Sequence, residues 1–154
     1  QADKLGMANI AQLVNVLQAM LLTDEAGRVV KTPTFHVFNL YRAHQGAILL
    51  PTHFESESAA DGLPAVSGSA SRQGEIVTLS LVNASLNGMA EVALNLGGVS
   101  VSDIRCRVLV GENVRSYNTF HQPDAVAPRT VTLSDLSHIS LPPASITVVQ
   151  ARLN

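Results

Sequence analysis

The sequence has little of several residue types, and each shortage argues against a class of protein. Cys106 is the only cysteine, so the chain can form neither an intrachain disulfide nor a cysteine-rich metal site. No apolar run approaches the roughly 18 residues that a membrane-spanning helix needs. The formal net charge is only -2, and the charges form neither a basic stripe nor an acidic run. We therefore expect no nucleic-acid partner and no membrane partner.

Motifs of common catalytic and metal sites are missing as well. The sequence has no HExxH zinc motif, no glycine-rich phosphate loop and no GxSxG nucleophile elbow. His36 and His44 fall on one predicted helix about two turns apart, too far to chelate one metal ion. The carboxylates Glu55, Glu57 and Asp61 cluster in a flexible segment, whereas a catalytic pair must be held rigidly. We expect no metal site, no cofactor and no catalytic residue in this chain.

The length sets a further bound. With 154 residues the chain can bury one core, but it is short for an enzyme with its own deep cleft. It begins at Gln1, with neither an initiator methionine nor a basic region followed by an apolar signal core. We expect it to be part of a longer protein.

The residues before about 47 show helical patterns. Apolar residues recur at the three-and-four spacing of an amphipathic helix, namely Ile10, Leu13, Val14, Leu17, Met20 and Leu21. Residues 7–11 alone also fit a short buried strand. A turn at 25–27 and a short extended piece follow. Thr32 then fits the N-cap of a second helix, and Pro33 fits its first position. This helix should end at Gly46. Its broad apolar sector is formed by Phe35, Val37, Phe38 and Tyr41.

After this point the pattern changes to short strands separated by turns. Apolar and polar residues alternate in 76–83, 90–96 and 104–110, and further short strands are expected in 130–136, 137–143 and 145–153. Such regular spacing predicts an antiparallel β-sandwich. Thr78 and Ser80 should face outward, and residues 55–75, rich in Ser, Ala and Gly, should be mostly loop. The expected inner face contains Val77, Leu79, Leu81, Val92, Leu94, Ile104, Cys106, Val108 and Val148.

Two polar features stand out in this apolar sequence. Gln12 and Asn15 lie in an apolar stretch, so their amides either bond neighbouring backbone or face a polar cleft. The loop NTFHQPDAV, residues 118–126, lies between two β-rich runs. Asn118 and Asp124 can hold it in shape by bonding nearby backbone amides, and sugar binding by His121 is the alternative.

Four separated segments carry a resemblance to a known family. They are, in chain order, ANIAQLVNVLQAMLLTD, TPTFHVFNLYRAHQ, NTFHQPDAVAP and LPPASITVVQ. In that order they resemble the C-terminal part of the α-L-arabinofuranosidases of glycoside hydrolase family 51. The resemblance runs almost from end to end of the chain and is weakest at 55–75.

The resemblance implies a fold that is mainly β: an antiparallel jelly-roll β-sandwich, preceded by a short helical remnant of the last β/α unit of a (β/α)8 barrel. Residues 1–47 would be the barrel remnant and residues 48–154 the C-terminal sandwich. The barrel strand would then include residues 7–11, against the helical periodicity there. Part of the Phe35, Phe38 and Tyr41 sector should be exposed, because barrel neighbours would normally cover it.

The resemblance also implies a function. The family releases terminal α-L-arabinofuranosyl residues from arabinan, arabinoxylan or their oligosaccharides, with retention of configuration and two glutamates on earlier barrel strands. Neither glutamate would lie in this chain, which would brace the barrel. A glutamine on the last barrel strand bonds the sugar ring in this family, and Gln12 matches it. Expected partners are the barrel, an arabinose-containing oligosaccharide and further copies of the enzyme, in a cytoplasmic rather than a secreted protein.

Two other functions fit a β-sandwich. One is an independent carbohydrate-binding module, which typically uses exposed aromatic platforms. Here there is no tryptophan, and only Tyr117 and Phe120 fall in the late sandwich. The other is a structural domain that serves oligomer assembly. Titration with arabinan or arabinoxylan oligosaccharides and a mass measurement in solution separate the two.

Overall fold

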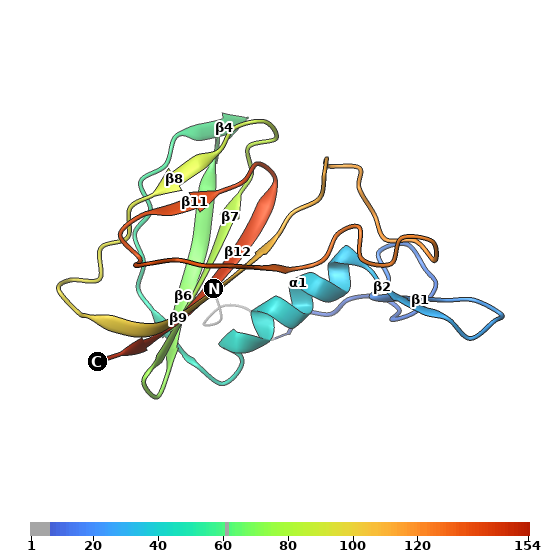
Figure 1. The fold of residues 1–154 in the computed structure, drawn as a ribbon, viewed down its shortest axis with the longest axis horizontal. Helices are drawn as coiled ribbons and strands as arrows, with labels where there is room; N and C mark the ends of the chain where they lie inside the picture. Colours follow the sequence, from blue (N-terminus) through green and yellow to red (C-terminus); the bar gives the residue numbers. More distant parts are fainter. Residues whose placement is uncertain (1–6, 61) are drawn as a thin grey trace.

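The computed structural model describes residues 7–60 and 62–154, and this part is mainly β with one short α-helix (Figure 1). Its largest element is a six-stranded antiparallel sheet with the strand order β10-β9-β12-β7-β6-β3. The strand bounds are β3 Ile48–Leu50, β6 Val66–Gln73, β7 Ile76–Asn83, β9 Val101–Leu109, β10 Arg129–Val131 and β12 Ser145–Leu153. The expected mainly β, antiparallel fold is confirmed. No helix in the described ranges has the length and apolar character needed to cross a bilayer.

A smaller sheet packs on one face of the large one. Strands β8 (Ala90–Val92) and β11 (Ile139–Leu141) pair antiparallel and form this second layer (Figure 1). The core between the two layers includes Leu79, Leu81, Cys106, Ile139 and Leu141. Burying each large aliphatic side chain stabilises the fold by about 1.5–3 kcal/mol. The two layers make the predicted sandwich, while its jelly-roll connectivity stays a prediction.

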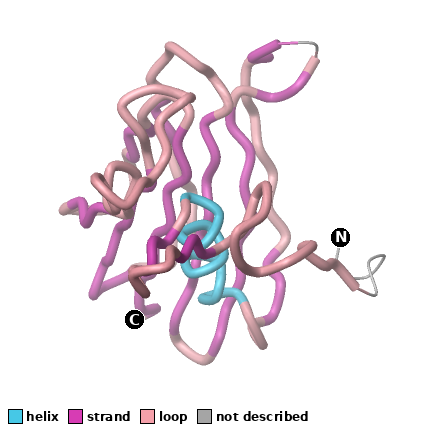
Figure 2. Tube along the Cα trace, turned by 90° about the vertical axis from the view of Figure 1, so that its right-hand side faces the viewer, coloured by secondary structure: helices cyan, strands magenta, loops and turns pink. Residues whose placement is uncertain are grey.

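Helix α1 (Pro33–Tyr41) covers the opposite face of the large sheet, and Figure 2 shows it in front of the strands. Leu40 of the helix is fully buried and packs with Leu109, Val126 and Val148. The sheet is therefore buried on both faces, which a simple alternation of apolar and polar residues does not indicate. Buried polar residues on this side must then find hydrogen-bond partners.

This second covered face corrects part of the predicted inner face. Leu79, Leu81, Cys106 and Val108 are buried in the sandwich core, and Val77, Val92, Leu94 and Ile104 are half-buried. Val148 is buried too, but on the helix-covered face, because its neighbour Val149 occupies the core side of β12. Thr78 and Ser80 were expected to face solvent. That is wrong, since they are 2% and 0% exposed.

The predicted loop at 55–75 is also wrong for most of its length. The hairpin of β4 (Ser58–Ala60) and β5 (Leu63–Pro64) lies there, followed by the eight-residue strand β6 next to β7. The small residues of β6 do not signal a loop. They leave room for neighbouring groups to come close: at Gly68, which has no side chain, the Phe54 ring lies against the strand and packs on the core. Two other strands are shorter than expected, β8 ending at Val92 and β10 at Val131.

We expect Gly68→Ala to destabilise the protein by about 1–3 kcal/mol, the usual cost of overpacking a core. A β-carbon at Gly68 would clash with the backbone oxygen of Ser80 and lie 3.0 Å from the Phe54 ring. Backbone cannot yield as a flexible side chain does, so the strand pair must shift. Urea unfolding checks this, with Ser67→Ala on an exposed position of the same strand as the control. Equal midpoints for the two variants would contradict it.

The N-terminal part departs furthest from expectation. Residues 7–20 form no helix, and residues 7–11 form no strand in the described structure. Instead β1 (Leu21–Thr23) pairs with β2 (Val29–Lys31) across the predicted turn, where Gly27 adopts a φ of 75°. This hairpin extends away from the large sheet (Figure 1). The helical spacing of apolar residues in 8–22 therefore does not reflect a helix here.

The second helical prediction is confirmed at its start. Thr32 caps helix α1 by accepting a hydrogen bond from the Phe35 amide, and Pro33 is its first residue. The α-helix ends at Tyr41, followed by the 3-10 turn η1 (Arg42–His44) and the left-handed Gly46. The apolar sector is only partly buried: Val37 and Tyr41 pack against the Leu40 cluster, while the buried residues of the helix are His36 and Leu40. Phe38 is 48% exposed, which confirms the expected partial exposure.

Candidate functional site

The segment around Gln12 has an unusual backbone. Gln12, Asn15 and Gln18 have φ angles of 46°, 56° and 67°, in the left-handed region that residues other than glycine rarely adopt. Three such residues in one short segment explain why no helix forms there. Residues held in sparsely populated backbone regions concentrate at ligand-binding sites. The Gln12 side chain is exposed, so its amide is available to a ligand.

Asn15, the other candidate amide, is used within the chain. Its Nδ2 donates to Thr23 Oγ1 at 2.9 Å, and its Oδ1 accepts from the Thr23 backbone amide at 2.7 Å. Its own backbone amide donates to the Leu21 carbonyl. Asn15 therefore fixes the segment against strand β1, which is the structural alternative that the sequence left open. Of the two amides, Gln12 stays the candidate for ligand binding.

The loop 118–126 is tied to the same hairpin from the other side. Asn118 is 2% exposed. Its Oδ1 accepts from the Val126 amide at 2.7 Å, while its Nδ2 donates to the Val126 carbonyl at 2.9 Å and to the Lys31 carbonyl at 2.7 Å. The first two bonds close the loop and the third fastens it to β2. Asn118 does hold the loop, as expected, through two bonds across the loop to Val126 and one to the distant Lys31 rather than through a local turn.

A second contact joins the loop to the turn of the hairpin. Arg28 stacks over the Phe120 ring with 5.0 Å between the guanidinium carbon and the ring centroid, a favourable cation–π arrangement. Arg28 Nε also donates to Asp24 Oδ2 at 2.7 Å. This hydrogen bond is the main reason that the pKa of the Asp24 carboxyl lies below its usual value. Hairpin and loop thus form one unit, here named the hairpin–loop unit, of residues 21–31 and 118–126.

The two helix histidines have packing roles. His44 bonds Ser71 Oγ at 2.7 Å through Nδ1 and Ser80 Oγ at 2.6 Å through Nε2, and so joins the end of the helix to β6 and β7. Burial lowers the pKa of His44, because the charged ring would lose its hydration. Ser80 is 0% exposed, so a substrate cannot reach this histidine–serine pair.

His36 is buried among other groups. Burial is the main cause that lowers the pKa of its imidazole, helped by the charge of Lys31 and opposed by that of Asp124. Its Nε2 has no hydrogen-bond partner among the described residues. The two histidines thus contact different groups, in keeping with their spacing. Within the described residues, no group of three or more His, Cys, Asp and Glu side chains could hold a metal ion.

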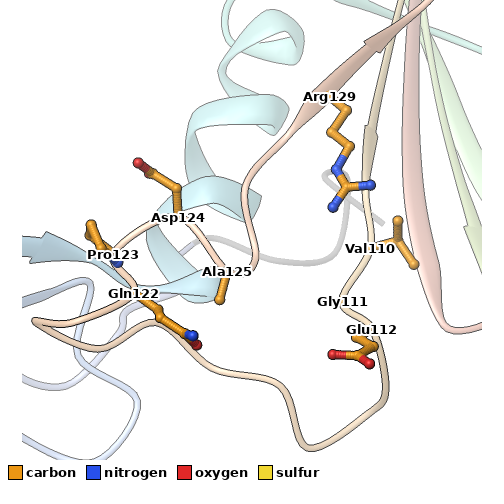
Figure 3. Close-up of a pocket in the computed structure, with 8 residues that line it drawn as sticks. All are labelled: Val110, Gly111, Glu112, Gln122, Pro123, Asp124, Ala125 and Arg129. Atoms are coloured by element: carbon orange, nitrogen blue, oxygen red, sulfur yellow. The ribbon is translucent and has the colours of Figure 1, made fainter.

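A shallow depression lies beside the loop (Figure 3). Its volume is about 690 Å³, and its lining includes Glu112, Gln122, Asp124 and Arg129. The side chains of Glu112 and Gln122 extend toward the space between them, whereas the Asp124 carboxylate points away from it (Figure 3). Ligand pockets usually enclose most of the ligand surface. This depression is open to solvent and does not enclose a ligand in that way.

The other candidates from the sequence do not come together into a site. Glu55 and Glu57 are exposed in the segment before β4, and Asp61 lies outside the described residues. Among the described residues, Glu55 approaches the exposed His53, at 3.8 Å. His121 and Asp124 are exposed on the loop, and the described hydrogen bonds give Asp124 no turn-closing role. The long-range bond from Asn118 to Lys31 had no sequence signal, because 87 positions separate the two residues.

Comparison with known proteins relates the chain to one family. Residues 1–145 match the family described as the alpha-L-arabinofuranosidase C-terminal domain. An intracellular exo-alpha-L-arabinofuranosidase of Bacteroides ovatus is 38% identical over 131 residues, which cover 82% of this chain and 25% of that protein. An exo-alpha-(1->6)-L-arabinofuranosidase of Bifidobacterium longum is 30% identical, with 98% of this chain and 31% of the relative covered.

A solved structure shows the same relationship in three dimensions. The family 51 arabinofuranosidase of Xanthomonas axonopodis pv. citri is 35% identical and superposes with a TM-score of 0.85, covering 98% of this chain and 32% of that one. The chain thus spans about a quarter to a third of the length of these relatives. The similarity includes both the sandwich and the N-terminal segment that carries Gln12.

Proposed function

Because the chain belongs to the family of α-L-arabinofuranosidase C-terminal domains, we propose that it is the C-terminal part of a retaining family 51 arabinofuranosidase. The enzyme would release terminal α-L-arabinofuranosyl residues from arabinan, arabinoxylan or their oligosaccharides. The match over residues 1–145 is the observation that carries this proposal. The two catalytic glutamates belong to the preceding part of the enzyme, and no catalytic residue is assigned to this chain.

Residues 1–47 form the last strand and helix of the catalytic barrel in this proposal, and residues 48–154 form the sandwich. Exposed apolar side chains support it: Leu13 is 54% exposed, Leu17 90% and Phe38 48%. Patches of this kind are usually covered by another surface, and the rest of the barrel would cover these. The packing of Leu40 against Val148 and Leu109 then braces the barrel on the sandwich.

Gln12 is the proposed substrate-binding residue. Its side chain is exposed and its φ of 46° is strained, so its geometry is compatible with an amide held toward a sugar. In a barrel of this type, ligands bind at the carboxyl ends of the strands. A glutamine directly after residues 7–11 would occupy that end. Its side-chain amide can both donate to and accept from sugar hydroxyl groups.

Two further features of the enzyme are proposed. The name of the Bacteroides ovatus relative supports an intracellular location. Edge strand β3 exposes Ile48 by 74% and Leu49 by 57%, and exposed apolar edges favour pairing with another chain. We therefore propose that the enzyme is a homo-oligomer, which a measurement of its mass in solution would test.

The central test is an assay of the full-length protein on a panel of 4-nitrophenyl glycosides. We expect hydrolysis of the α-L-arabinofuranoside and at least a hundredfold lower rates on pyranosides. The released sugar should keep its anomeric configuration, as two carboxyl groups about 5–5.5 Å apart give retention. NMR of the first product checks this. Inversion, or preference for a pyranoside, would contradict the proposal.

A further inference from the structure

Asn118 is held in one orientation by its neighbours. The Val126 amide can donate only to an oxygen, so the Asn118 Oδ1 must lie there, at 2.7 Å. The Nδ2 of the same amide group then faces two carbonyl oxygens, that of Val126 at 2.9 Å and that of Lys31 at 2.7 Å. With 2% of the residue exposed, water cannot replace these partners. The amide therefore fixes the position of the Lys31 backbone relative to the sandwich.

From Lys31 the strand pairing of β2 with β1, followed by backbone hydrogen bonds, leads to Gln12. Lys31 is paired with Leu21 across the β1–β2 ladder. The amides of Met20 and Leu21 both donate to the Leu13 carbonyl at 3.1 Å, and Leu13 follows Gln12 directly in the chain. In Figure 1 the orange segment that contains Asn118 lies beside β2.

Thr32, which follows β2 directly, adds a second connection to the segment before β1. Its amide donates to the Met20 carbonyl at 3.0 Å, and its hydroxyl donates to the Ala19 carbonyl at 2.7 Å. The segment before β1 is therefore bonded on one side to the helix start and on the other to β1. A shift of the Lys31 backbone would be passed on to Leu13 through these bonds.

We propose that Asn118 of the sandwich is a positioning residue for the substrate contact made by Gln12, an inference that rests on the proposed function. Asn118 does not touch the sugar. It holds β2, and through β1 the strained backbone at Gln12, at a fixed distance from the sandwich. The polar loop 118–126 thus serves the active site from a domain that contributes no catalytic group.

A double-mutant cycle in the full-length enzyme tests this. Asn118→Asp keeps the acceptor for the Val126 amide but places an oxygen against the Lys31 carbonyl, which repels it. We expect kcat/KM for an aryl α-L-arabinofuranoside to fall about 10-fold, since small misplacements of binding groups are costly. In the Gln12→Ala background the same substitution should change kcat/KM less than 2-fold, because the contact that Asn118 positions is already gone.

Thr119→Ala is the matched control. Its hydroxyl accepts from the Gln122 amide within the loop, so the substitution loosens the loop without touching the bond to Lys31. It should leave kcat/KM within 2-fold of the parent. Asn118→Ser removes the Nδ2 group that donates to the Lys31 and Val126 carbonyls and adds no charge. This variant repeats the cycle if the aspartate variant does not fold.

The outcomes separate the two proposals. Equal losses from Asn118→Asp with and without Gln12 would overturn the positioning role and leave the substrate contact in place. A Gln12→Ala enzyme with unchanged kcat/KM would remove the substrate contact itself, and the positioning role with it. A loss from Thr119→Ala as large as that from Asn118→Asp would also overturn the proposal, because it would show general sensitivity to the loop.

Discussion

The 154-residue chain by itself is expected to release no sugar from an aryl α-L-arabinofuranoside, whereas the full-length enzyme is expected to turn it over. Retaining hydrolysis needs one carboxyl group with a raised pKa, which protonates the leaving oxygen, and an ionised one that attacks. The pKa values of Asp24 and Asp135 are instead lowered, chiefly by hydrogen bonds from Arg28 and Ser137. Such carboxyls are poor proton donors near neutral pH.

Other carboxylates of the chain are also unsuited to this reaction. Glu75 and Asp103 approach each other through Arg152, at 2.8 and 3.3 Å. Both are 68% exposed at the side chain, so water competes for any charge they stabilise, and the guanidinium occupies the space where a substrate would have to lie.

The measurement is an assay of the purified chain at high concentration beside the full-length enzyme and a heat-inactivated blank. Turnover that exceeds the blank and survives repurification away from host glycosidases would contradict the prediction. It would then direct the search for a catalytic pair to Glu55, Glu57, Asp61 and Asp124.

Gln12→Ala in the full-length enzyme is expected to lower kcat/KM by about 10- to 100-fold. Removing one partner of a hydrogen bond leaves a polar group of the enzyme–sugar complex unpaired, which costs about 1–3 kcal/mol.

Gln18→Ala provides a close control for that variant. Gln18 is also an exposed glutamine with a left-handed backbone, at a φ of 67°, in the same segment. The two substitutions remove the same amide and change the backbone strain alike, so only a sugar contact distinguishes them. Steady-state kinetics on an aryl α-L-arabinofuranoside should show Gln18→Ala close to the parent. Equal kinetics for both variants would rule out Gln12 as the substrate contact.

The sequence predicted those parts of the fold that rest on local chemistry. The alternation in β7 and β9 identified core residues such as Leu79 and Cys106. Thr32 and Pro33 set the start of helix α1, and Gly27 and Gly46 adopt the left-handed conformations that end local elements. Each of these features depends on a few neighbouring residues, so a single sequence carries enough information.

The candidate site depended on more than pattern. Gln12 was singled out by the family resemblance, since periodicity alone placed residues 8–22 on a helix. The structure has no helix there, because left-handed residues interrupt the segment and Asn15 bonds Thr23 instead. Side-chain bonds of this kind compete with helix formation, and a hydrophobic pattern does not register them.

Tertiary structure alone decided which surfaces are covered. Helix α1 packs on the second face of the sheet, and this buries Ser80 and places Val148 opposite the sandwich core. Pairing with β7 makes a strand of residues 66–73, a segment whose composition is that of a loop, and Phe54 approaches Gly68 there. Asn118 meets Lys31 across 87 positions. Local sequence determined the periodic strands, the caps and the turns, whereas contacts between distant residues depend on how the whole chain packs.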